Sequence, residues 1–217
     1  MVYDNLTILL GTLCLASVTV HVISEWRKWQ TARSISKLLA STSFVVLAVI
    51  NGAADSSYSR LILLALVFSL VGDVLLLSLR SAFLLSGIIA FFFAHVLFAA
   101  AFGSQRLDTM WLIAALTVLV AAGLLVLRWM WRYLKSFYKV AVPVYLAAIT
   151  LMTALAIAAS SASGPPLLAI AAISFAASDV SVARDRFIAK SIVNKVWGLP
   201  LYYAAQILFA ISVLLFK

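Results

Sequence analysis

The chain has few acidic residues, a single cysteine and none of the short motifs that mark several common enzyme classes. Its 217 residues include seven Asp and Glu and one cysteine, Cys14. A single thiol excludes an intramolecular disulfide. The sequence contains no G-x-S-x-G, H-E-x-x-H, P-loop or G-x-G-x-x-G pattern. It therefore lacks the nucleophile elbow, the zinc-protease helix and the glycine-rich nucleotide loops that these patterns form.

Apolar residues are abundant instead. They make up 65% of the sequence, and the mean hydropathy is +1.15, whereas a soluble domain is about 45–50% apolar. A helix that crosses the bilayer needs about 20 mostly apolar residues. We therefore expect an all-α integral membrane protein, an eight-helix transmembrane bundle that forms one domain over residues 1–217. The expected helices span residues 5–24, 35–52, 60–79, 82–103, 110–130, 139–160, 165–183 and 196–216.

The Lys and Arg residues lie mainly on one side of the expected bundle. Of these 16 residues, 13 fall in or beside the connectors that follow the first, third, fifth and seventh helices. The positive-inside rule then places these connectors in the cytoplasm and both termini outside it. We interpret the formal net charge of +9 as a signal of membrane topology, so we expect no nucleic-acid partner.

Three polar side chains lie inside the apolar segments: Asp73 in SLVGDVLLL, His95 in FFFAHVLFAAAF and Asp179 in SFAASDVSV. A charged side chain near the bilayer centre costs about 2.5–3.5 kcal/mol on insertion scales, so it is rarely kept without a partner or a task. One interpretation is structural, since an interhelical hydrogen bond or ion pair also locks helices together. The other is functional, and it makes these three residues the first candidates for a site.

The two aspartates can divide acid–base work. Burial in apolar surroundings opposes the charged form of a carboxyl group. An unpaired Asp73 or Asp179 is therefore expected to be neutral and able to donate a proton. The other carboxylate can then act as a base or as an electrostatic stabiliser. His95 is expected deeper in the membrane as a supporting group, although with both aspartates it would also complete a three-ligand set for a metal.

Further polar residues lie in or next to the cytoplasmic half of the expected helices. Together they predict a pocket that opens to the cytoplasmic leaflet, with the basic connectors at the level of the lipid phosphates. The candidates for substrate binding are Ser69, Ser178, Lys195, Tyr202, Tyr203 and Gln206.

These segments together resemble the YhhN family of multi-pass membrane proteins. The resemblance runs from about Ser69 to Ser212, and it rests on VGDVLLL, AFFFAHVLFAAAF, VPVYLAAITLM, SFAASDVSVARDRF and LYYAAQILFAIS in this order. The sixth helix departs from the family pattern, because its tyrosine is Tyr145 instead of standing at position 147, which is Ala147 here. The resemblance therefore does not place Tyr145 in the pocket.

The resemblance implies a lysoplasmalogenase, an enzyme that hydrolyses the vinyl ether bond of a lysoplasmalogen to a fatty aldehyde and glycerophosphocholine or glycerophosphoethanolamine. It implies that Asp73 and Asp179 perform the acid–base work with support from His95, and that no metal or organic cofactor is needed. The implied partners are the lysophospholipid substrate and membrane lipids. The expected location is a bacterial inner membrane, or the endoplasmic reticulum in a eukaryote.

The main rival is a proton-coupled transporter for small molecules or lipids, since intramembrane Asp and His residues also form proton relays. Many transporters interrupt their helices near the midplane, whereas Pro143 and Pro200 of this chain lie near expected helix ends. A structural or lipid-binding membrane protein is the third alternative, and it predicts that both aspartates tolerate alanine.

Overall fold

The computed structural model describes residues 5–78, 80–163 and 165–215, and this part of the chain contains eight long α-helices and no strand. The predicted all-α bundle is therefore confirmed. A 3₁₀ turn at Trp131–Tyr133 follows the fifth helix, and a π-helical turn at Arg184–Ile188 follows the seventh. The helices are α1 (Asn5–Arg27), α2 (Gln30–Ile50), α3 (Ser57–Leu75), α4 (Ser81–Gly103), α5 (Thr109–Met130), α6 (Tyr138–Ser163), α7 (Leu167–Ala183) and α8 (Ile192–Ser212).

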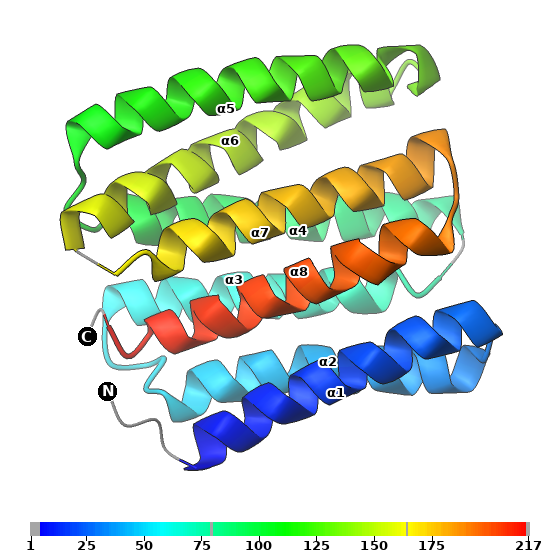
Figure 1. Cartoon of the computed structure of the whole chain (residues 1–217), viewed down its shortest axis with the longest axis horizontal. Coiled ribbons are helices and arrows are strands. Elements are labelled where there is room, and N and C mark those ends of the chain that lie inside the picture. Colours follow the sequence, from blue (N-terminus) through cyan, green and yellow to red (C-terminus); the bar gives the residue numbers. More distant parts are fainter. Residues whose placement is uncertain (1–4, 79, 164, 216–217) are drawn as a thin grey trace.

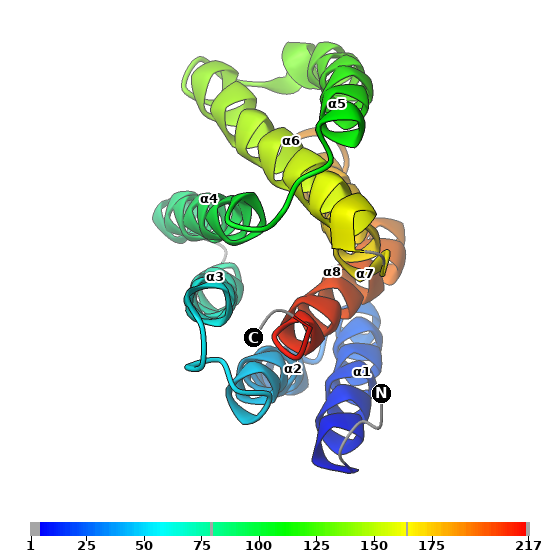
Figure 2. The ribbon, with the colours of Figure 1, turned by 90° about the vertical axis from the view of Figure 1, so that its left-hand side faces the viewer.

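The helices lie side by side, roughly along the long axis of the molecule (Figure 1). Consecutive helices form hairpins, in which α1 packs on α2, α3 on α4, α5 on α6 and α7 on α8. In the end-on view α8 lies between α7 and the hairpin of α1 and α2 (Figure 2), and it also contacts α3. α1 begins and α8 ends at the same end of the bundle, as an even number of antiparallel helices requires.

Seven helices in the described part of the chain, α1 to α7, are long and apolar enough to cross a membrane. α8 has a similar length, but Asn194, Tyr202, Tyr203 and Gln206 make it more polar. All four are buried, because α8 packs against α1, α2, α3 and α7. The chain is therefore an integral membrane protein whose last helix carries polar side chains into the protein interior.

Several helix ends differ from the expected ones, and two of these differences concern Lys37 and Asp73. α2 begins at Gln30, after a tight turn in which Lys28 takes a φ of 60°. Lys37 therefore lies within the helix and is buried, although we expected it at a helix boundary as a topology signal. α3 ends at Leu75, so Asp73 lies in its last turn instead of further from the end.

A cluster of buried aromatic rings forms the core between α4, α7 and α8. The ring centroids of Phe98, Phe175 and Phe209 lie 4.3–6.3 Å apart. Phe91 and Tyr202 continue this cluster, with their centroids 5.8 Å apart. Such edge-to-face contacts stabilise aromatic pairs beyond the burial of their area. The cluster fixes the positions of α4, α7 and α8, which carry seven of the nine candidate residues.

The close approach of α3 and α4 depends on Gly72. A Cβ atom at this position would lie 2.6 Å from the ring of Phe91, which is closer than packed side chains allow. Asp73 follows Gly72 in the sequence, and the carbonyl of Phe91 binds His95. The absence of a side chain at Gly72 therefore sets the spacing between two elements of the candidate site.

The connection between α7 and α8 is held by the π-helical turn and by Asn194. The turn is closed by a bond from the Ala189 N–H to the Arg184 carbonyl at 2.9 Å. Asn194 Nδ2 donates to Asp185 Oδ1 at 3.1 Å and to the Ala189 carbonyl at 2.9 Å. Asn194 Oδ1 accepts from Arg184. π-helical turns often occur at functional sites, and this one places Arg186 on the wall of a cavity.

Candidate functional site

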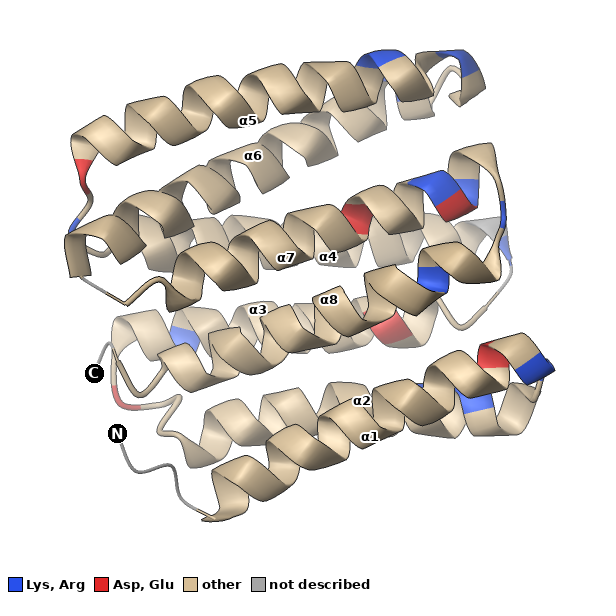
Figure 3. Ribbon diagram, viewed as in Figure 1, with Lys and Arg blue, Asp and Glu red and all other residues tan. Residues whose placement is uncertain are grey.

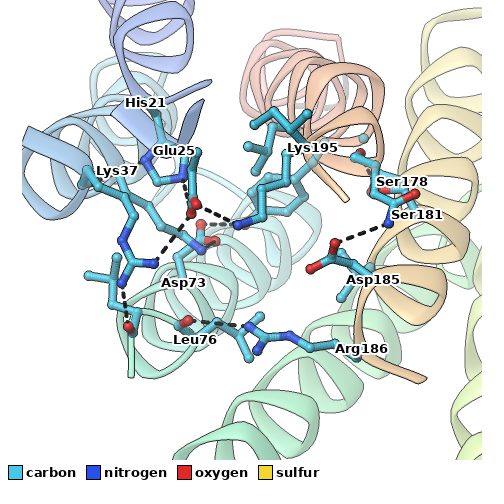
Figure 4. A pocket seen from close by; sticks show the side chains of 18 of the residues that line it. His21, Glu25, Lys37, Asp73, Leu76, Ser178, Ser181, Asp185, Arg186 and Lys195 are labelled. Atoms are coloured by element: carbon cyan, nitrogen blue, oxygen red, sulfur yellow. Dashed lines mark hydrogen bonds and ion pairs between the residues drawn. The ribbon is translucent and has the colours of Figure 1, made fainter. Parts of the chain in front are cut away.

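A cavity of about 520 Å³ lies at the end of the bundle where most Lys and Arg residues gather (Figures 3 and 4). We call it the polar cavity. Six basic and four acidic side chains line it, so it carries an excess of positive charge that favours an anionic group such as a phosphate. The charged lining residues are Glu25, Lys28, Arg33, Lys37, Asp73, Asp179, Asp185, Arg186, Lys190 and Lys195.

Asp73 lies on the wall of the polar cavity among three hydrogen-bond donors. Lys37 Nζ is 3.1 Å from Asp73 Oδ1, and Ser41 Oγ and Tyr202 Oη each donate to Asp73 Oδ2 at 2.7 Å. The Asp73 side chain is 4% exposed and that of Lys37 is 10% exposed. A cation and two hydroxyl donors stabilise the ionised form. Asp73 is therefore paired with a cation and two hydroxyl donors, which is the interhelical contact that the structural interpretation of the sequence allowed.

Asp179 forms a second group with His95 and Tyr145. His95 Nε2 lies 3.1 Å from Asp179 Oδ2, and Tyr145 Oη donates to the same oxygen at 3.4 Å. His95 is fully buried, whereas 13% of the Asp179 side chain is exposed. The group thus joins α4, α6 and α7, and Asp179 is the member that lines the polar cavity.

One proton belongs to the pair of His95 and Asp179. His95 Nδ1 lies 2.6 Å from the carbonyl oxygen of Phe91, and a carbonyl only accepts, so Nδ1 carries a hydrogen. His95 Nε2 makes no aligned hydrogen bond to any described residue, but it is in contact with the carboxyl oxygen of Asp179. Two lone pairs would repel each other at this distance. The contact is therefore favourable only when Nε2 or the carboxyl group carries a proton.

A further carboxylate, Glu25, connects the helices at the rim of the polar cavity. Lys195 Nζ donates to Glu25 Oε2 at 2.5 Å, and Arg33 Nη1 lies 3.5 Å from Glu25 Oε1. Arg33 also donates to the carbonyl of Leu77 at 2.8 Å. These contacts join α1, α2, α8 and the segment after α3 (Figure 4). Lys195, a candidate for substrate binding, is therefore engaged by a carboxylate at the cavity wall.

A second space of about 320 Å³ lies between α4, α5, α6 and α7, and we call it the apolar groove. Leu, Ile, Val and Ala side chains form most of its lining, with Leu119, Val126 and Ile173 among them. Asp179 and Arg186 line both the apolar groove and the polar cavity. The two spaces therefore meet at these residues.

The candidate residues from the sequence occupy two layers. One layer lines the polar cavity and consists of Asp73, Ser178, Asp179, Lys195 and Tyr202. The other layer is fully buried and consists of Ser69, His95, Tyr203 and Gln206. Sequence reasoning identified two partners of the aspartates, Tyr202 and His95. It did not identify the other three, which are Lys37, Ser41 and Tyr145.

The three-ligand metal set that the sequence allowed is not assembled. His95 contacts Asp179, whereas Asp73 is held by Lys37, Ser41 and Tyr202. Within residues 5–78, 80–163 and 165–215, no three His, Cys, Asp or Glu side chains come together in a way that could hold a metal ion. The arrangement instead places the His95–Asp179 pair and the separately held Asp73 at the wall of the polar cavity.

Comparison with known proteins agrees with the resemblance seen in the sequence. The profile of the YhhN family matches residues 7–213. Lysoplasmalogenase TMEM86A of Bos taurus is 29% identical to this chain over 157 residues, which is 70% of this chain and 64% of the bovine protein. The match thus spans less than two thirds of the length of that relative. No solved structure matches the chain. Because the family profile covers nearly the whole helical bundle, the chain belongs to the YhhN family.

Proposed function

We propose that this protein hydrolyses the vinyl ether bond of lysoplasmalogens and releases a fatty aldehyde and glycerophosphocholine or glycerophosphoethanolamine. Membership of the YhhN family and the likeness to a protein named lysoplasmalogenase support this activity. The observation that carries the proposal is the position of the His95–Asp179 pair, which holds a proton where the polar cavity meets the apolar groove. A lysoplasmalogen carries its vinyl ether between a polar headgroup and an apolar chain.

The first step of vinyl ether hydrolysis needs an acid that protonates carbon. In our proposal the His95–Asp179 pair gives its proton to the outer alkenyl carbon. The electrons of the double bond form the new C–H bond, and an oxocarbenium ion remains. Asp73 does not serve as this acid in our proposal, because both of its oxygens are already engaged by Lys37, Ser41 and Tyr202.

Water completes the reaction. It adds to the oxocarbenium carbon, and the proton that it loses returns to the His95–Asp179 pair. The hemiacetal then collapses as its bond to the glycerol oxygen breaks, and that oxygen receives the proton of the hemiacetal hydroxyl through the same pair. Asp73 supplies a fixed negative charge in the same cavity, which stabilises the cation. These steps follow the logic of two-carboxylate glycosidases and use no metal or organic cofactor.

The polar cavity is the proposed site of the headgroup. Its excess of basic side chains suits the phosphate, and Arg186 lies where the headgroup side meets the apolar groove. Ser178 and Tyr202 line the wall beside the two aspartates. The buried side chains of Ser69, Tyr203 and Gln206 would support this wall from behind without touching the lipid.

The activity can be tested directly with the purified chain in detergent. We expect it to release fatty aldehyde from lysoplasmenylcholine, lysoplasmenylethanolamine or both. In heavy water the aldehyde should carry one deuterium beside the carbonyl carbon, because the first step protonates that carbon. A 1-O-alkyl lysolipid lacks the double bond and should remain intact as the matched control. Absence of aldehyde from both substrates would contradict the proposal, and lipid flux into liposomes without product would favour the proton-coupled transporter.

We also propose that the polar cavity faces the cytoplasm and that both termini lie outside it, in a bacterial inner membrane or, in a eukaryote, the endoplasmic reticulum. Most Lys and Arg residues lie at the cavity end (Figure 3), as the positive-inside rule expects of a cytoplasmic face. After Cys14→Ala, single cysteines can be placed at the exposed positions Arg106 and Lys190, at opposite ends of the bundle. In intact bacterial cells an impermeant maleimide should label Arg106→Cys and spare Lys190→Cys. The reverse labelling would overturn this orientation.

A further inference from the structure

The polar cavity and the apolar groove share Leu76, Asp179, Val182 and Arg186 on their walls. Asp179 therefore borders both spaces. Charged side chains on one side favour a headgroup, and the apolar lining on the other side favours a hydrocarbon chain. The groove volume of about 320 Å³ falls within the range of about 300–1,000 Å³ that is typical of ligand sites.

The apolar groove extends a limited distance beyond the reacting centre. It is lined by Tyr145, which contacts Asp179, and further along α6 by Thr150 and Thr153. At a rise of 1.5 Å per residue, Tyr145 and Thr153 lie about 12 Å apart along the helix axis. Thr153 is fully buried, and its hydroxyl has no hydrogen-bond partner among the described residues. On α6 the lining of the groove ends at Thr153 in this direction.

The groove selects its occupant by shape. The hydrocarbon chain of a lysolipid comes from a bilayer that is as apolar as the groove. Its transfer into the groove therefore contributes little binding free energy. A chain that fits leaves the vinyl ether beside Asp179. A chain that is too long for the groove must bend or leave through the wall, and it then displaces the vinyl ether from the proton-carrying pair. In an apolar pocket a mismatch of one methylene group changes specificity by about 10–200-fold.

We propose that the apolar groove holds the alkenyl chain of the substrate and that Thr150 and Thr153 set the chain length that the enzyme accepts. The proposal rests on the proposed function, because it takes the bond beside Asp179 to be the vinyl ether. Thr150 is a specificity residue in this scheme. It lines the groove and lies five residues beyond Tyr145 on α6.

A substitution within the groove tests the proposal. Thr150→Phe places a ring in the groove, so kcat/KM for a dodecenyl lysolipid should fall about 10-fold or more relative to a hexenyl lysolipid. Turnover of the hexenyl substrate should persist, because its chain ends before the ring. Leu151→Phe is the matched control, since the neighbouring Leu151 is 49% exposed and does not line the groove. It should keep the ratio of the unsubstituted protein.

Binding measurements separate this proposal from the proposed function. Non-hydrolysable 1-O-alkyl lysophosphocholines of both chain lengths should raise the melting temperature of the unsubstituted protein, and Thr150→Phe should lose only the effect of the long chain. If Thr150→Phe loses only the long-chain effect but no aldehyde is released, the proposed hydrolase activity is wrong and the groove assignment is supported. If aldehyde is released but the chain-length ratio is unchanged in Thr150→Phe, only the groove assignment is wrong. If Thr150→Phe does not fold, Thr150→Leu should shift the ratio in the same direction by a smaller factor, and an unchanged ratio there overturns the proposal.

Discussion

Asp179→Asn should lower kcat for lysoplasmalogen hydrolysis by about 10²–10⁴-fold, which is the range expected when a general acid–base group is removed. The amide has nearly the shape of the carboxyl group, and its oxygen can still accept from the Tyr145 hydroxyl, which lies 3.4 Å from Asp179 Oδ2. It cannot share a proton with His95 Nε2, which lies 3.1 Å from the same oxygen. Aldehyde release gives the rate, and a melting curve checks the fold.

The pairing of Asp179 with His95 makes a second result expected. His95→Gln should cause a loss similar to that of Asp179→Asn, and the double variant should be little slower than the slower single variant, because residues that act as a unit are not additive. Independent roles would instead multiply the two losses. Asp55→Asn is the matched control, since this exposed carboxylate lies in the connection between α2 and α3, at the opposite end of the bundle, and should not affect the rate. A folded Asp179→Asn protein with activity within about tenfold of the unsubstituted chain would show that the acid lies elsewhere.

The helices of this protein were predictable because an apolar run of about 20 residues is a local signal that needs no knowledge of packing. α8 shows where the signal weakens. Its central position among other helices allows it to carry Asn194, Tyr202, Tyr203 and Gln206 in buried positions, so its composition depends on neighbours that a hydropathy average does not include. The early start of α2 depends on the tight turn at Lys28. No strong turn motif in the sequence predicts this turn.

Asp73 and Asp179 were predictable because a charge inside an apolar run is conspicuous, whereas their partners were not. A lysine close to a helix end usually signals topology, and only the packing of α2 on α3 brings Lys37 to Asp73. Tyr145 was set aside because of its spacing along one helix, but its contact with Asp179 depends on how α6 packs against α7. The sequence therefore left open whether either aspartate was paired, and only the packing of the helices brings their partners to them.

Lys37→Met should lower the free energy of unfolding by about 3–5 kcal/mol, because it leaves the buried Asp73 carboxylate without its cation. Lys37 Nζ lies 3.1 Å from Asp73 Oδ1, and both side chains are almost completely buried. Methionine has a similar length, so the loss would reflect charge and not a cavity. Unfolding in a denaturing detergent titration measures the effect. Lys135→Met removes an exposed lysine and should change stability by no more than about 0.5 kcal/mol.

The double variant Lys37→Met/Asp73→Asn separates the structural role of Asp73 from its role in the reaction. Replacing both members of a buried ion pair by neutral groups is often nearly neutral, and the asparagine oxygen can still accept from Ser41 and Tyr202, which donate to Asp73 Oδ2 at 2.7 Å. We therefore expect the double variant to regain most of the stability that Lys37→Met loses. Its kcat should stay about 10²-fold or more below that of the unsubstituted protein, because the negative charge that stabilises the oxocarbenium ion is gone. If stability and activity return together, Asp73 only holds the helices in place, and the His95–Asp179 pair performs the reaction without a second carboxylate.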